Sequence, residues 1–136
     1  MSVRKQIVDA LVARFEAISG VTTVDQWAVG SLGVSDLPAI VVRDADSSAN
    51  SESMSETEHV AEINIDVLAE GDNAMDAVDA IVENVLLKIG EDETIGSLCE
   101  FCTLGGVAKS LEQQEDRIAS ANVVVSANYS TELWQF

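Results

Sequence analysis

The first repeating pattern of apolar residues in the chain has helical spacing. Between residues 2 and 18 these residues recur at three- and four-residue steps, as Val3, Ile7, Leu11, Phe15 and Ile18. This spacing places them on one face of an amphipathic helix. Ser2 is a candidate N-cap, and the Ser-Gly pair at residues 19–20 predicts the end of the helix.

Strand patterns follow this helix. Residues 21–29 (VTTVDQWAV) predict a short β segment, and the glycines and serines of residues 30–36 (GSLGVSD) are typical of a loop. Residues 37–44 (LPAIVVRD) predict a buried strand. Its β-branched residues follow Pro38, and the first position of a strand tolerates proline.

Residues 58–70 (EHVAEINIDVLAE) alternate with a period of two. The apolar set that points inward is Ala61, Ile63, Ile65 and Val67, and the polar set that points outward is Glu62, Asn64 and Asp66. This alternation predicts a strand with one buried face and one solvated face.

The pattern then returns to helical spacing in residues 71–92 (GDNAMDAVDAIVENVLLKIGED). The predicted inward face comprises Met75, Val78, Ile81, Val82, Val85 and Ile89. Asp72 is the candidate N-cap of this helix, and Gly90 is its candidate C-cap.

The remaining third of the chain predicts strands. Residues 93–102 (ETIGSLCEFC) suggest one further helical turn, and LGG at 104–106 predicts a break before a strand at 107–114. Residues 118–131 alternate and predict a long, half-exposed strand. The order of elements predicts an α+β fold, a two-layer sandwich with two main helices packed on one face of a mixed or antiparallel β-sheet.

Composition and charge narrow this picture. The length of 136 residues predicts a single domain over 1–136, and a content of 47% hydrophobic but 4% aromatic residues predicts an aliphatic core. With 24 acidic and 7 basic residues, the formal charge of −17 argues against sequence-specific nucleic acid binding. Because the sequence contains neither a secretory signal pattern nor a membrane-length apolar run, we expect a cytosolic protein that does not bind membranes.

Residues 44–59 (DADSSANSESMSETEH) contain five serines, five acids and no basic residue. This composition predicts a mobile acidic loop at about 44–57, since it buries too little surface to offset the cost of ordering the chain. Long connections in compact domains tend to be functional. The acids are therefore candidate partner-binding residues, namely Asp44, Asp46, Glu52, Glu56 and Glu58.

Cys99 and Cys102 have C-x-x-C spacing, but they do not begin a helix as in thioredoxin-like sites. A zinc site would need two further ligands, and His59 is the only histidine. His59 as a catalytic base also lacks a nucleophile in any recognised motif. We therefore predict no catalytic residues and interpret the two cysteines as small core or boundary residues.

A stripe of carboxylates, Asp72, Asp76, Asp79 and Glu83, follows the spacing of one helix face. Hard cations prefer such oxygens, but the segment lacks the pattern of a calcium loop. The stripe is better interpreted as a solvated helix face, with a divalent ion site as the alternative. The sequence thus predicts no cofactor and no metal site.

The order of these segments resembles the tail terminator, or minor tail protein U, family of long-tailed, lambda-like bacteriophages and prophages. The resemblance rests on the N-terminal helix, on LPAIVV at 37–42 and the acidic insertion after it, and on AEINIDVLAE at 61–70 running into a helix. It also includes the charged hairpin EQQEDR at 112–117, which leads to SANVVVSANYS at 120–130.

This resemblance implies a structural protein without enzyme activity. It would cap the tail tube, end tube polymerisation and form the head-joining surface, and its location would be the host cytoplasm during assembly and then the virion tail. Its partners would be copies of itself in a hexameric ring, the tail tube protein and the head-tail connector protein. The alternatives are another phage neck or tail completion protein, or a small acidic metal-binding domain or enzyme.

Overall fold

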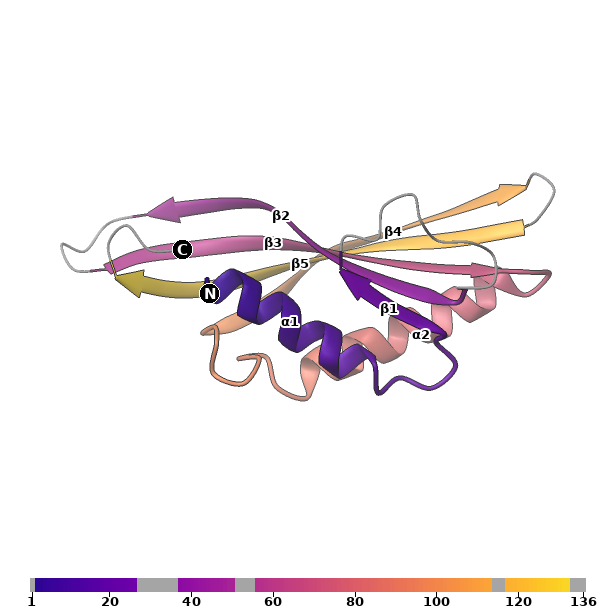
Figure 1. Cartoon of the computed structure of the whole chain (residues 1–136). Helices are drawn as coiled ribbons and strands as arrows, with labels where there is room; N and C mark the ends of the chain where they lie inside the picture. Colours follow the sequence, from indigo (N-terminus) through magenta and orange to yellow (C-terminus); the bar gives the residue numbers. More distant parts are fainter. Residues whose placement is uncertain (1, 27–36, 51–55, 114–116, 133–136) are drawn as a thin grey trace.

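The computed structural model describes residues 2–26, 37–50, 56–113 and 117–132. The elements in chain order are α1 (Val3–Phe15), β1 (Thr23–Gln26), β2 (Ala39–Asn50), β3 (Glu56–Glu70), α2 (Ala74–Gly90), β4 (Phe101–Gln113) and β5 (Arg117–Glu132). The strands form one sheet in the order β1-β2-β3-β5-β4 (Figure 1). Residues 27–36, which include the predicted loop, and residues 114–116, within the predicted hairpin, lie outside the described ranges.

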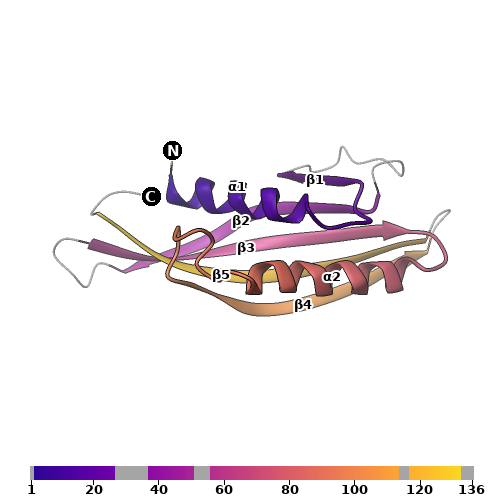
Figure 2. The ribbon, with the colours of Figure 1, turned by 90° about the horizontal axis from the view of Figure 1, so that it is seen from below.

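The sheet is mixed, because β1 is parallel to β2 while the other neighbouring strands are antiparallel. Both helices lie on the same face of the sheet (Figure 2). This arrangement confirms the predicted α+β fold with two layers. Neither helix in the described part of the chain is long and apolar enough to span a membrane.

The core lies between the helices and the two central strands, β3 and β5. Alternate residues of both strands are buried from Thr57 to Ala69 and from Ala119 to Thr131, and the register pairs Ile65 with Val123. The helices cover these residues with two apolar stripes, Ile7, Leu11 and Phe15 from α1 and Val78, Val82 and Val85 from α2. The predicted alternation and both predicted helix faces are confirmed, although Met75 is only half-buried.

The two helices begin in different ways. The Ser2 Oγ accepts a hydrogen bond from the Lys5 N–H at 3.1 Å, which confirms the predicted cap of α1. The prediction of Asp72 as the cap of α2 is wrong, because the N-cap is Asn73. The chain reverses at Gly71, which has a φ of +103°, a value that glycine adopts readily. The Gly71 carbonyl accepts a hydrogen bond from the Ala74 N–H at 3.2 Å. Asp72 therefore lies inside this turn.

Two predictions for the region after α2 are also wrong. Residues 93–98 form turns instead of a helical turn, with Ile95 and Ser97 at positive φ, which an α-helix does not allow. The LGG segment does not break the chain, since β4 runs through it from Phe101 to Gln113. The register with β5 shifts between Leu104 and Gly106, so a β-bulge accommodates the glycines within the strand.

The acidic segment is largely strand. Residues 44–50 belong to β2 and pair with β3, which begins at Glu56, so the expected loop at 44–57 is wrong for these residues. The physical reason lies in the partner strand. Thr57 and His59, near the start of β3, are buried on one face of the sheet, so the polar residues 44–50 pair with a partly buried strand. Residues 51–55 lie outside the described ranges, and the mobility of the connection remains a prediction.

Candidate partner-binding surfaces

The acids predicted to bind a partner do not form one surface. Asp44 pairs in register with Ile63, which is buried beneath the helices, so its side chain lies on the helix side of the sheet. There its Oδ2 lies 3.8 Å from Nε of Arg4, a buried residue of α1. Asp44 therefore takes part in the packing of α1 on β2.

Glu56 and Glu58 are exposed and lie on the opposite face of β3. Glu56 is directly opposite Glu132 on β5, and Glu58 is opposite Ser130. Asp46 lies where the register of β2 shifts, between Asp44 and Ser47, and its side chain lies outside the described part of the structure.

Glu52 also lies outside the described residues. The structure therefore brings Glu56 and Glu58 together and places Asp44 on the other side of the sheet.

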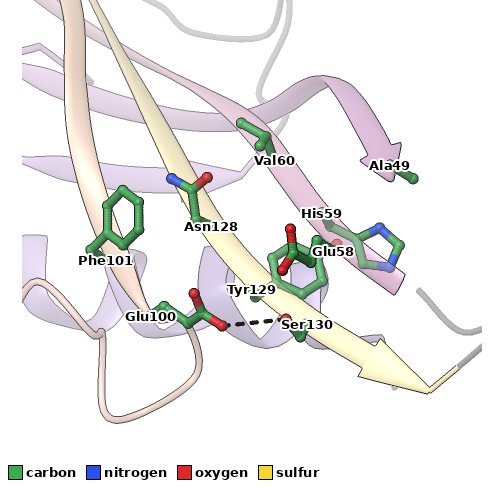
Figure 3. A pocket seen from close by; sticks show the side chains of 9 residues that line it. All are labelled: Ala49, Glu58, His59, Val60, Glu100, Phe101, Asn128, Tyr129 and Ser130. Carbon is green, nitrogen blue, oxygen red and sulfur yellow. Dashed lines mark hydrogen bonds between the residues drawn. The ribbon is translucent and has the colours of Figure 1, made fainter. Parts of the chain in front are cut away.

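Glu58 lines a hollow of about 490 Å³ on the sheet surface (Figure 3). The lining comprises Ala49, Glu58, His59, Val60, Glu100, Phe101, Asn128, Tyr129 and Ser130. Val60, Asn128 and Phe101 form one register row across β3, β5 and β4. Because Val60 is 38% exposed and Phe101 is 45% exposed, this row presents apolar surface to solvent. We call these nine residues the sheet-face hollow.

The charge of the sheet-face hollow is negative. It contains two carboxylates, Glu58 and Glu100, and none of its nine lining residues is Lys or Arg. The Ser130 hydroxyl donates to Oε1 of Glu100 at 3.3 Å, which holds this carboxylate beside the apolar row. Apolar surface next to carboxylates suits a partner side chain with an aliphatic stem and a positive end.

His59 contributes to the packing of the core. Its ring stacks on Tyr129 with centroids 4.8 Å apart and an interplanar angle of 8°, and both residues are buried. The Nε2 atom of His59 lies 2.8 Å from Oγ1 of Thr131. This arrangement supports a structural role for His59.

A second apolar surface lies on the helix side of β4. Leu104, Val107 and Leu111 are 55%, 40% and 42% exposed, and they pair with Val125, Val123 and Ala119, which are buried beneath the helices. They remain exposed because α2 packs mainly on β3 and β5 and covers little of β4. We call these three residues the β4 ledge.

The carboxylate stripe borders the β4 ledge. Asp79 of α2 forms an ion pair with Lys109, which lies between Val107 and Leu111 on the same side of β4. Asp76 and Glu83 are exposed. Among the residues described here, no group of three or more His, Cys, Asp or Glu is arranged to hold a metal ion. The structure thus places these acids on an exposed helix face.

The middle of the sheet face opposite the helices is polar. Arg43 Nη2 lies 2.6 Å from Asp66 Oδ2, and Asn122 Nδ2 donates to Asp66 at 2.8 Å and to Asn64 at 3.2 Å. These contacts link β2, β3 and β5. The predicted outward residues Asn64 and Asp66 are therefore half-exposed members of a cross-strand network.

The two cysteines lie at the start of β4 and in the turn before it. Cys99 is buried and Cys102 is half-buried, as the sequence predicts, and both are free thiols. Their Sγ atoms are 3.7 Å apart, and the Cys99 thiol donates to the Glu93 carbonyl at 3.4 Å. The hydrogen bond between the two thiols lowers the pKa of Cys99, and the same bond together with burial raises the pKa of Cys102.

Comparison with known proteins bears on the fold. No protein-family model and no curated protein matches the sequence. The structure is similar to a chain in the solved virion of a native gene transfer agent (GTA) particle, with a TM-score of 0.51 and 10% sequence identity. The match covers 90% of this chain and 93% of that chain. Similarity at this identity shows a shared fold.

Proposed function

We propose that this chain is a structural component of a phage-like virion and, within that class, a tail terminator. The observation that carries the proposal is the shared fold with a chain of a gene transfer agent virion over nearly the whole length of both chains. The order of sequence segments supports the same class independently. In this role the protein caps the tail tube, ends its polymerisation and provides the surface that joins the head.

The two apolar surfaces fit a subunit that assembles in a ring. In a cyclic ring each subunit contacts one neighbour with one surface and the next neighbour with a different surface. The β4 ledge lies on the helix side of the sheet, and the exposed residues Val60 and Phe101 of the sheet-face hollow lie on the opposite side. We therefore propose that copies of this chain form a hexamer and that the tail tube and head-tail connector proteins bind the finished ring.

The negative charge fits a channel that DNA traverses. A basic lining would hold phosphates through counterion release, whereas an acidic lining binds them weakly. We propose that Glu56, together with Asp46 and Glu52, faces the channel or the tube end, whereas Glu58 binds a partner from within the sheet-face hollow. The contact of Asp44 with Arg4 supports a structural role for that residue. No catalytic step, cofactor or metal enters this function.

The assembly state of the purified protein tests the proposal. The charge of −17 on every subunit opposes association, and salt screens this repulsion. We expect sedimentation velocity to show monomer at low salt and low concentration, and negative-stain images to show rings at high salt and high concentration. A protein that remains monomeric under all of these conditions, with or without the tube protein, would contradict the proposal.

Removal of the chain from a phage or prophage that carries it tests the function in the cell. We expect tails of uncontrolled length that do not join heads, and we expect the wild-type chain supplied in trans to restore both properties. Normal tails and infectious particles in the absence of the chain would contradict the tail terminator role.

A further inference from the structure

The two cysteines lie close together in the fold, with their sulfur atoms near the distance from which a disulfide bond can form. Cys102 is the second residue of β4, and it pairs with Ala127, which is buried on the helix side of the sheet. Cys99 lies in the preceding turn, and its Sγ is 3.7 Å from that of Cys102. A disulfide requires an S–S distance of about 2.05 Å, so the two sulfur atoms must approach each other by less than about 2 Å.

The pair is accessible from one side. Cys99 is only 6% exposed, whereas Cys102 is half-buried and lines a surface hollow of about 140 Å³. Leu86, Ile89 and Gly90 of α2 and Leu104 of β4 also line this hollow. A small disulfide molecule in solution therefore reaches Cys102 first.

We propose that Cys99 and Cys102 are a redox modification site that forms a reversible intramolecular disulfide by exchange with low-molecular-weight disulfides such as glutathione disulfide. This inference does not depend on the proposed function. It adds to that function one consequence: a subunit built with free thiols in a reducing cytosol would close the bond after it reaches an oxidising medium.

The exchange proceeds in two steps. In the first, the Cys102 thiolate attacks one sulfur of glutathione disulfide, the S–S bond of glutathione breaks, and one glutathione thiolate leaves. In the second, the Cys99 thiolate attacks the Cys102 sulfur of the mixed disulfide and releases the second glutathione. The two cysteines lose two electrons and two protons, which the two glutathione molecules take up.

Accessibility assigns the order of these steps, because Cys102 lines the hollow and Cys99 is buried. The hydrogen bond with Cys99, together with burial, raises the pKa of Cys102. The first step, which needs the Cys102 thiolate, is therefore the slower one. We expect the rate of oxidation to rise with pH, since the thiolate is the attacking species.

The bond would fasten the turn after α2 to the start of β4. This turn contains the buried Ile95 and ends at the backbone hydrogen bond from Glu100 N–H to the Asn128 carbonyl, 2.6 Å long. The closed loop is short, so the entropic stabilisation is at the low end of the range for disulfides. We expect a rise of about 2–6 °C in Tm on oxidation.

The test uses the purified full chain, first reduced and then incubated with glutathione disulfide. Intact mass after alkylation with N-ethylmaleimide should show the loss of two hydrogen atoms and no added maleimide, and dithiothreitol should restore two reactive thiols. Each single variant, Cys99→Ser and Cys102→Ser, has no second thiol to close the bond. Cys99→Ser should therefore retain one glutathione, and Cys102→Ser should react more slowly because Cys99 is buried.

Three results would overturn the inference. They are a wild-type chain that keeps glutathione on both cysteines, a chain that forms disulfide-linked dimers, or a folded chain that reacts only after unfolding in urea. Circular dichroism of each variant establishes that it is folded before oxidation. The readout is a mass and a melting temperature, so it is independent of ring formation.

Discussion

Arg14 joins the end of α1 to Asp92 in the turn that follows α2. Its Nη2 lies 3.2 Å from Asp92 Oδ2, and its Nη1 donates to the backbone carbonyl of Asp92 at 2.8 Å. The Asp92 carboxylate also accepts the backbone N–H of Thr94 at 3.0 Å and that of Gly96 at 2.9 Å. One carboxylate therefore fixes both the turn and its contact with the other helix.

The first prediction concerns the pH dependence of this contact. Hydrogen bonds from the Thr94 hydroxyl and from the backbone N–H groups of Gly96 and Thr94 lower the pKa of Asp92 from 3.8 to about 2. Because the folded state lowers this pKa, the carboxylate stabilises the fold above about pH 4, and the contribution is lost as the pH falls through about 2. Asp92→Asn should therefore lower Tm at neutral pH.

The difference in Tm between wild type and Asp92→Asn should shrink as the pH falls below about 4. Thermal unfolding over a pH series measures it. Glu83→Gln, an exposed substitution on α2, is the matched control and should leave Tm nearly unchanged. A difference for Asp92→Asn that stays constant down to the lowest pH would show that its carboxylate does not act through its charge.

The second prediction separates Asp44 from Glu58. Asp44→Asn removes the charge that faces the buried Arg4, so it should lower the free energy of unfolding by about 1–3 kcal/mol. Glu58→Gln, on the exposed face, should change it by less than about 0.5 kcal/mol. Urea unfolding measures both. Equal effects of the two substitutions would contradict the separation of these acids between the two faces.

The third prediction concerns the β4 ledge. The double variant Leu104→Ser, Leu111→Ser should remain folded, because both side chains are already exposed, but it should lose ring assembly under conditions where the wild type assembles. Leu87→Ser is the control. Leu87 is 61% exposed on α2, about half a turn from its buried stripe. Rings of normal stability from the double variant would exclude the ledge from the interface.

The fourth prediction tests the core. Ile65→Ala in β3 removes a fully buried side chain between the sheet and the helices, and it should lower the free energy of unfolding by about 2–5 kcal/mol. Glu62→Ala on the half-exposed face of the same strand should cost far less. Denaturant titration gives both values, and a loss below about 1 kcal/mol for Ile65→Ala would indicate a loosely packed core.

The central part of the fold was predictable because the spacing of its apolar residues matches the repeat of the strand or helix that they form. Residues 58–70 and 118–131 each have one buried face and one solvated face, so the alternation marks them as strands. Val78, Val82 and Val85 likewise mark the buried stripe of α2. In these segments the local pattern and the tertiary environment agree.

The edge strand β4 was harder to predict. Leu104, Val107 and Leu111 are spaced by three and four residues, yet they share one face, because the bulge after Leu104 restores the alternation. Their exposure depends on the position of α2, which no local pattern encodes. The sheet-face hollow was missed for a related reason, since Val60 and Phe101 meet only through the register of both strands with Asn128.

The position of β5 in the sheet has a consequence for the order in which the molecule folds. Although β5 follows β4 in sequence, it lies between β3 and β4 and pairs with both. During synthesis, β4 leaves the ribosome before the strand that holds it in the sheet, and the pairing of Ile63 with Val125 joins residues far apart in the chain. Such non-local contacts slow folding. The nascent chain therefore has one edge of β3 and both edges of β4 unpaired until β5 is made, and unpaired strand edges are where chains associate with one another.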